Sequence, residues 1–248
     1  MTTPNGADAP ANNLLRALRP DDFALLRPYL RPTSVRTGQV LYEPGDEVRH
    51  VHFPLDRTLL AFRVVLDDGR AVETALVGRE GAMAGIVSQG RLPAYSRAEV
   101  VHHGPLLRME VEQLEGAKLK SLSIRHLFAR YADCLMAQVF QSVACNAAHS
   151  IEQRAAKWLL SALERTSDAR VPLIQEQLAD MLGVGRSYVN RVIQSLKARE
   201  LIETHRGALT VADPEGLRAL ACGCQSSVRR HFEEVLKGVY PDDPIRPA

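Results

Sequence analysis

Residues 173–202 read LIQEQLADMLGVGRSYVNRVIQSLKARELI, two amphipathic segments separated by Gly183-Val184-Gly185. Gly183 suits the left-handed position that ends a helix, and the small side chain of Ala179 lets a second helix approach closely. The pattern predicts a helix-turn-helix, whose second helix runs from about residue 186 to 200 and can enter a DNA major groove. The apolar positions that face inward are Leu178, Ala179 and Leu182, then Val189, Val192, Ile193 and Leu196.

The side chains left on the outer face of the second helix can hydrogen-bond to nucleic acid. Arginine can bind guanine with two hydrogen bonds, asparagine can bind adenine, and serine or tyrosine can reach base edges or phosphates. The candidate DNA-binding residues are Arg186, Ser187, Tyr188, Asn190, Arg191 and Lys197, with Gln175 at the start of the first helix and Arg206 beyond the second.

Residues 201–212 predict a β-hairpin whose tip, His205-Arg206-Gly207, forms the wing of a winged helix, with Arg206 near a phosphate. Residues 186–206 hold five basic and two acidic side chains, a local net charge of +3, although the whole chain carries only +2. This local excess favours a nucleic-acid surface. The alternative is an ordinary three-helix unit whose charges are only solvated.

A different pattern covers residues 35–109, where short apolar runs alternate with turn signals such as Pro44-Gly45-Asp46 and Asp68-Gly69. Many short strands at this spacing predict a compact antiparallel sandwich or barrel. Residues 14–30 predict two short helices, and residues 1–13 a flexible tail. The expected strands lie at 40–42, 50–53, 59–66, 72–77 and 99–101.

No proline or glycine interrupts residues 118–165, which predicts a long helix with a hinge or a new helix start at His149-Ser150. The stripe Leu127, Tyr131, Leu135 and Val139 follows helical spacing. One small sheet cannot cover such a helix, so we expect it to pair with the same helix of a second subunit. A helix that packs only within its own chain is the alternative.

The composition agrees with a globular protein that works in the cytoplasm. Hydrophobic residues make up 46% of the 248 residues, enough for a buried core, and no apolar run is long enough to span a membrane. The N-terminal residues lack the basic and apolar regions of a signal peptide. The four cysteines are too sparse for a disulfide framework, which favours a reducing compartment.

At these motifs the sequence resembles the Crp/Fnr superfamily of transcription regulators. The resemblance rests on residues 38–46 (GQVLYEPGD), Asp68-Gly69-Arg70, residues 77–81 (VGREG) and above all residues 175–186. It implies an α+β fold with an N-terminal double-stranded β-helix (jelly-roll) sensor domain at 14–116, a dimerisation helix at 117–148, a winged helix at 149–225 and a C-terminal helix and tail at 226–248. It also implies a homodimer on a palindromic operator in double-stranded DNA, RNA polymerase as a partner and a small-molecule effector.

The chain departs from the family at two places. The family's recognition helix begins Arg-Glu-Thr-Val-x-Arg; Arg186 and Arg191 match its arginines, but Ser187 replaces the glutamate that accepts from cytosine. Gly85-Ile86 lacks the glutamate of cyclic-nucleotide pockets, and the arginine expected about ten residues later stands late, at Arg97. Arg79, Glu80, Gly85 and Arg97 remain the candidate effector pocket, and the broken motif argues against a cyclic nucleotide.

Cofactors and catalysis are not expected. The oxygen-sensing branch of the family holds an iron–sulfur cluster on cysteines near the N-terminus, whereas the first cysteine here is Cys134. His50-x-His52 resembles a cupin metal motif without its glutamate, and Val51 and Phe53 read as the inward pair, which leaves both histidines outside. Cys222-x-Cys224 on a helix would point about 200° apart, so the two cysteines are read as inert rather than redox-active or metal-binding. A ligand-binding or metal-dependent barrel with a helical accessory domain is the alternative function.

Overall fold

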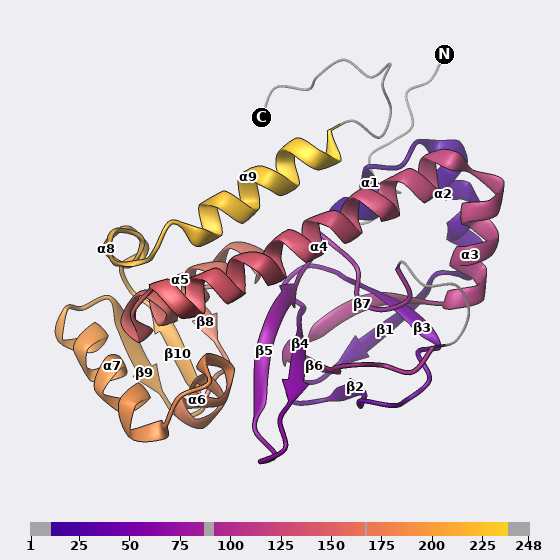
Figure 1. Ribbon diagram of the computed structural model, residues 1–248. Helices are drawn as coiled ribbons and strands as arrows, with labels where there is room; N and C mark the ends of the chain where they lie inside the picture. The colour runs from indigo at the N-terminus through magenta and orange to yellow at the C-terminus, as the bar shows by residue number, and fades with distance from the viewer. Residues whose placement is uncertain (1–10, 87–91, 167, 238–248) are drawn as a thin grey trace.

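The computed structural model describes residues 11–86, 92–166 and 168–237 (Figure 1). It opens with three short helices, α1 (Asn13–Arg16), α2 (Pro20–Leu26) and the 3-10 helix η1 (Arg27–Tyr29). The Asn12 side chain accepts a hydrogen bond from the Leu15 amide and so caps α1, while Pro20 occupies the first turn of α2. The two short helices predicted for residues 14–30 are therefore present.

Seven strands form an antiparallel sandwich of two sheets. One sheet has the order β1-β7-β3, and the other has the order β2-β6-β4-β5. Apolar residues of both sheets, among them Leu60, Val100 and Leu106, pack between them. The strands are β1 (Arg31–Val35), β2 (Val40–Tyr42), β3 (His50–Pro54), β4 (Leu59–Val65), β5 (Ala71–Val77), β6 (Arg97–His102) and β7 (Gly104–Glu110).

Turn-forming residues in the sequence correctly predicted the positions of most of these strands. Gly69 adopts a left-handed φ of 84° in the β4–β5 hairpin, where Asp68-Gly69 predicted a turn. The predicted runs omitted β1 and β7, which pair with each other in full register from Arg31↔Arg108 to Val35↔Gly104. Gly104-Pro105 reads as a turn signal in the sequence, but here it opens β7, because proline is tolerated at the beginning of a strand.

The prediction that both histidines of β3 lie outside is wrong for His52. Val51 and Phe53 are fully buried as expected, but His52 is buried too, because its backbone pairs with Met83 in the loop that follows β5. Burial lowers the pKa of His52 to about 3. The alternation of polar and apolar residues along one strand cannot reveal that a loop covers the outer face of the sheet.

The predicted long helix is interrupted on both sides of its central part. α3 (Val111–Lys120) ends at Ser121, whose hydroxyl accepts a hydrogen bond from the Ile124 amide and so starts α4 (Leu122–Ala148). A second break at His149-Ser150, where the sequence indicated one, separates α4 from α5 (Ile151–Thr166).

The C-terminal part contains a three-stranded sheet of order β8-β10-β9 with helices on it. Its elements after α5 are β8 (Arg170–Val171), α6 (Gln175–Leu182), α7 (Arg186–Ala198), β9 (Ile202–His205), β10 (Ala208–Val211), α8 (Pro214–Leu220) and α9 (Cys224–Leu236). α9 lies along α4 on the side away from the sandwich (Figure 1), with the Arg130 guanidinium donating to the Val235 carbonyl.

The sandwich and the C-terminal part share one hydrophobic core. Leu59 and Leu76 of the sandwich belong to the same buried cluster as Leu160 of α5 and Leu178 of α6. Two polar contacts reinforce it: Trp158 Nε1 donates to Glu73 Oε1 at 2.8 Å, and Arg165 Nε to Glu80 Oε1 at 2.7 Å. The helix-turn-helix is therefore docked against the sensor-like sandwich.

Candidate nucleic-acid interface and effector cavity

The helix-turn-helix forms where the sequence predicted it. Gly183 caps α6 with a left-handed φ of 66°, and the Val184 amide donates to the Ala179 carbonyl across the turn. Val189, Val192, Ile193 and Leu196 of α7 are buried, which fixes the rotation of this helix about its own axis. Its opposite face therefore points into solvent.

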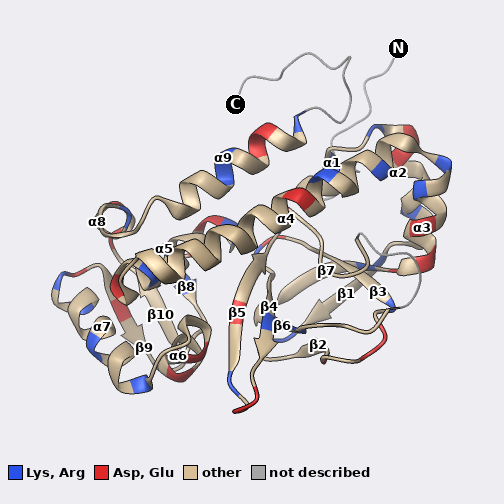
Figure 2. Cartoon of the chain, viewed as in Figure 1, with Lys and Arg blue, Asp and Glu red and all other residues tan. Residues whose placement is uncertain are grey.

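The predicted DNA-binding side chains project from this outer face. Arg186, Ser187, Tyr188, Asn190, Arg191 and Lys197 of α7 are all exposed. No ion pair with another residue that the structure describes engages Arg186, Arg191 or Lys197, and the Arg191 guanidinium lies 5.1 Å from the Tyr188 ring centroid. Basic residues mark α7, whereas α6 beside it carries acidic ones (Figure 2). The face is thus a basic, hydrogen-bonding surface.

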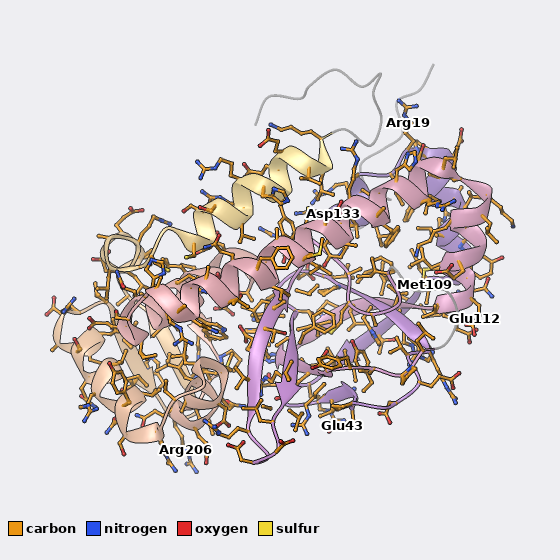
Figure 3. The ribbon with its side chains drawn as sticks, in the orientation of Figure 1. Arg19, Glu43, Met109, Glu112, Asp133 and Arg206 are labelled. Carbon is orange, nitrogen blue, oxygen red and sulfur yellow. The ribbon has the colours of Figure 1, made fainter. Side chains whose placement is uncertain are left out.

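The two other predicted DNA contacts have different positions. Arg206 is exposed in the tight turn between β9 and β10, at the outer edge of the winged helix (Figure 3). Gln175 is half-buried at the first position of α6, at the end of that helix away from the turn. Arg206 therefore extends the exposed surface of α7, while Gln175 offers only part of its side chain.

The structure does not gather the four predicted effector-pocket residues at one place. Arg97 donates to Glu43 Oε2 at 2.8 Å, an interaction that raises the pKa of Arg97. Gly85 has a left-handed φ of 57°, and a Cβ there would lie 2.5 Å from Val111, so this glycine serves packing. Of the four predicted residues, only Arg79 and Glu80 line a common cavity. The prediction that Gly85 and Arg97 belong to the same pocket is therefore corrected.

That cavity, of about 380 Å³, lies between β5, α1, α4, α5 and α9. Glu73, Glu80 and Gln225 line it, and each has one buried side-chain atom without a partner among the described residues: Glu73 Oε2, Glu80 Oε2 and Gln225 Nε2. Burial raises the pKa of Glu73 to about 7, against the opposing charges of Arg63, Lys157 and Arg165. A cavity with unsatisfied polar groups can accept a small polar molecule.

The predicted dimer interface needs a correction at Leu127 and Tyr131. Both are buried within the chain's own core, and the Tyr131 hydroxyl donates to the Ala82 carbonyl at 2.9 Å. Gly81 has no side chain, and a Cβ there would collide with the Tyr131 ring. Leu135 is half-buried and Val139 is 36% exposed, so only the Leu127 and Tyr131 end of the predicted stripe is covered by the chain's own core.

A second stripe on α4 is exposed along its whole length. Its members repeat at alternating intervals of four and three residues, the period of a coiled-coil seam. Only His126 and Asp133 (labelled in Figure 3) are polar among them. We call this set the exposed seam; it consists of Leu122, His126, Ala129, Asp133, Met136, Phe140, Val143 and Ala147.

The cysteines are arranged differently from the prediction. α8 ends at Leu220 and α9 begins at Cys224, so Cys222 lies in the connection before α9 and the two cysteines do not share a helix. This connection brings both cysteines to Cys145 and His149, at the end of α4. A Cys-x-Cys pair and a Cys-x-x-x-His pair were visible in the sequence, but no pattern linked them.

Comparison with known proteins agrees with this architecture. Residues 153–220 match the Crp-like helix-turn-helix domain. FixK2 from Bradyrhizobium japonicum has a similar structure (TM-score 0.64, 17% identity, covering 78% of this chain and 98% of that one). So do the c-di-GMP-responsive regulator CLP from Xanthomonas campestris (0.63, 13%, 79% and 100%) and the CRP-family regulator TTHB099 from Thermus thermophilus (0.63, 21%, 76% and 96%). No curated protein matches the chain.

Residues 153–220 therefore carry a Crp-like helix-turn-helix domain, and the fold of the chain is that of these solved regulators. The resemblance seen in the sequence is confirmed, as is the fold of a jelly-roll domain, a long helix and a C-terminal helix-turn-helix. In the described part of the chain, no helix combines the length and apolarity needed to cross a membrane.

Proposed function

We propose that this chain binds a palindromic operator as a homodimer in the cytoplasm and that an effector adjusts this binding. The observation that carries the proposal is the outer face of α7, where Arg186, Asn190 and Arg191 project into solvent with no acidic partner among the described residues. Arginine and asparagine at the start of a recognition helix can read base edges in the major groove. RNA polymerase is the partner that a transcription regulator of this type would engage.

The exposed seam of α4 supports the homodimer. Met136, Phe140, Val143 and Ala147 form an apolar run, and Phe140 is 64% and Val143 66% exposed. A second copy that packs the same stripe against this one would bury both, as a two-fold coiled coil does. Such a dimer presents two α7 helices, one for each half of a palindrome.

The effector has a candidate site in the 380 Å³ cavity. Its walls join the sandwich, through Glu73 and Glu80, to Trp158 and Arg165 of α5 in the DNA-binding part. A molecule that donates hydrogen bonds to the two carboxylates would compete with Trp158 and Arg165 for them. The competition would shift the population of positions that the helix-turn-helix adopts on the sandwich.

Selection of bound sequences from random duplex DNA by the full chain tests the proposal. We expect a palindrome whose half-sites are about one helical turn apart. Recovery of unrelated sequences, with equal affinity for all of them, would contradict specific binding. Trp158, the single tryptophan of the chain, provides the second readout, because a molecule that enters the cavity should change its fluorescence.

A further inference from the structure

Four side chains with soft metal-ligand atoms meet at the end of α4, outside the DNA-binding surface. Cys145 and His149 are one helical turn apart at this end, and Cys222 and Cys224 approach them from the α8–α9 connection. The four ligand atoms all lie within 4.8 Å of one another. We propose that Cys145, His149, Cys222 and Cys224 bind one Zn²⁺ ion in a closed, four-coordinate site.

The spacing of the ligand atoms fits a tetrahedral ion. Zn–S bonds of about 2.3 Å and Zn–N bonds of about 2.0–2.1 Å place two sulfurs roughly 3.8 Å apart and a sulfur and a nitrogen roughly 3.6 Å apart. Cys145 Sγ lies 3.6 Å from Cys222 Sγ, and Cys224 Sγ lies 3.6 Å from His149 Nδ1. Two edges of the tetrahedron are therefore already formed, and the widest separation shortens when the ion binds.

The chemical nature of the four ligand atoms favours Zn²⁺ over other metal ions. Three thiolates and an imidazole are soft or borderline ligands, which Ca²⁺ and Mg²⁺ do not favour. A cluster of several irons and bridging sulfides needs its cysteines further apart than these four atoms are. Four protein ligands leave no position for water or substrate, so the site suits a structural rather than a catalytic zinc.

The surroundings of the four residues support a charged site. Cys145, Cys222 and Cys224 are at most 8% exposed, and Gln141 Nε2 donates to Cys224 Sγ at 3.1 Å, as outer partners of metal ligands do. Three thiolates around Zn²⁺ leave a net charge of −1. The buried Arg154 guanidinium supplies the opposite charge nearby.

Arg154 connects the site to the helix-turn-helix. It donates to the Leu182 carbonyl, the last residue of α6, at 2.7 Å. Burial lowers the pKa of Arg154, and negative charge on Cys145 and Cys222 acts in the opposite direction. Metal binding would therefore stabilise a buried cation that holds the DNA-reading turn in place.

Binding the ion changes protonation only. Each of the three thiols loses its proton to solvent as its sulfur bonds to Zn²⁺, and His149 binds through the lone pair of neutral Nδ1. No group is oxidised or reduced. The ion cross-links residues 77 positions apart and so fixes α9 against α4.

The test is the metal content of the full chain, purified without an affinity tag under reducing conditions. We expect one zinc per chain by elemental analysis, and a cobalt-substituted form with the sulfur-to-cobalt charge-transfer and d–d bands of a tetrahedral thiolate site. Cys222→Ser should lose nearly all of the metal. Cys134→Ser is the matched control, because Cys134 is a fully buried cysteine of α4 outside the cluster.

A chelator keeps the test informative if a variant fails to fold. It should lower the melting temperature of the wild type and of Cys134→Ser, and the loss should be reversed by Zn²⁺. A chain with four free thiols that retains no metal and gives no cobalt spectrum overturns the proposal. So does iron in place of zinc, or a Cys145–Cys222 disulfide in peptides of the unreduced protein, which would make the pair a redox site.

Discussion

Arg186 is the first residue of α7, and its exposed guanidinium lies where a recognition helix meets base edges. Ser187 beside it offers a short hydroxyl where Crp/Fnr proteins carry glutamate, so the base preference of this chain should differ at the position that Ser187 faces. The stacking of Arg191 on Tyr188 orients a second guanidinium before DNA arrives. These residues determine the specificity that we propose.

We expect Arg186→Ala to weaken binding to the selected operator by about 1–3 kcal/mol, roughly 5- to 150-fold, because it removes a two-hydrogen-bond contact with one base. Competition with duplexes that carry single-base changes measures the effect, and discrimination should vanish at one position of each half-site. Arg230→Ala, which removes an exposed arginine from α9, is the control and should leave affinity unchanged. An equal loss on every sequence would show that Arg186 contacts a phosphate.

The helix α4 has two apolar faces, one buried within the chain and one exposed. One face, which includes Leu127 and Tyr131, is buried against the sandwich and α1, while the exposed seam has nothing on it within the described chain. Both faces have helical spacing, and at 100° per residue they point in nearly opposite directions, about 160° apart. The burial of one face therefore leaves the other free for a second copy.

Phe140→Asp should convert the dimer into a monomer. It places two carboxylates opposite each other in the apolar half of the seam, and the dissociation constant should rise on the order of 100-fold or more. Sedimentation velocity over a concentration series measures the change. Leu119→Asp, at a leucine of α3 that is 82% exposed and outside the seam, is the matched control. Unchanged association of Phe140→Asp would remove the seam from the dimer.

At the scale of the whole molecule, the sandwich and the DNA-binding part share a hydrophobic core, and two carboxylates of the sandwich reinforce it. Glu73 and Glu80 of the sandwich each receive a hydrogen bond from α5, and each retains one buried oxygen without a partner among the described residues. Such half-satisfied carboxylates are costly, so the docked arrangement is open to change by protonation or by a ligand.

Glu73 makes stability depend on pH with a defined sign. Its pKa is about 7 in the folded chain against 4.5 for an ordinary glutamate, so the folded state holds the extra proton between these values. The stability that this group contributes is therefore fully present below pH 4.5 and is lost as the pH rises through 7. His52, with a pKa of about 3, acts oppositely, because its contribution is present above pH 6.5 and is lost as the pH falls towards 3.

Glu73→Gln isolates this effect, since it keeps an oxygen for Trp158 Nε1 and removes the charge, while His52 stays in both proteins. We expect the variant to melt above the wild type at about pH 8 and the difference to shrink towards about pH 5. Thermal melting across that range, followed by the fluorescence of Trp158, measures it. A constant difference at all pH values would show that Glu73 does not titrate in this window.

The sequence by itself determined the local architecture. Apolar spacing and Gly183 predicted the helix-turn-helix, and Asp68-Gly69 predicted a hairpin. The apolar spacing also predicted which side chains of α7 face outward, because they lie opposite the buried face of that helix. The residues of its turns and helix ends also carry the resemblance to the Crp/Fnr superfamily, which the family model matches over residues 153–220.

Tertiary structure alone decided which surfaces meet. The stripe of Leu127 and Tyr131 looked like a dimer seam, but the loop at Gly81 covers it, and helical spacing cannot say which of two apolar faces a domain will occupy. The predicted pocket does not form at Gly85 and Arg97, because Gly85 packs against Val111 and Arg97 pairs with Glu43. Glu73 with Trp158, and Cys145 with Cys222, are joined only by the folded chain, since residues 77 to 85 positions apart share no period that a sequence can display.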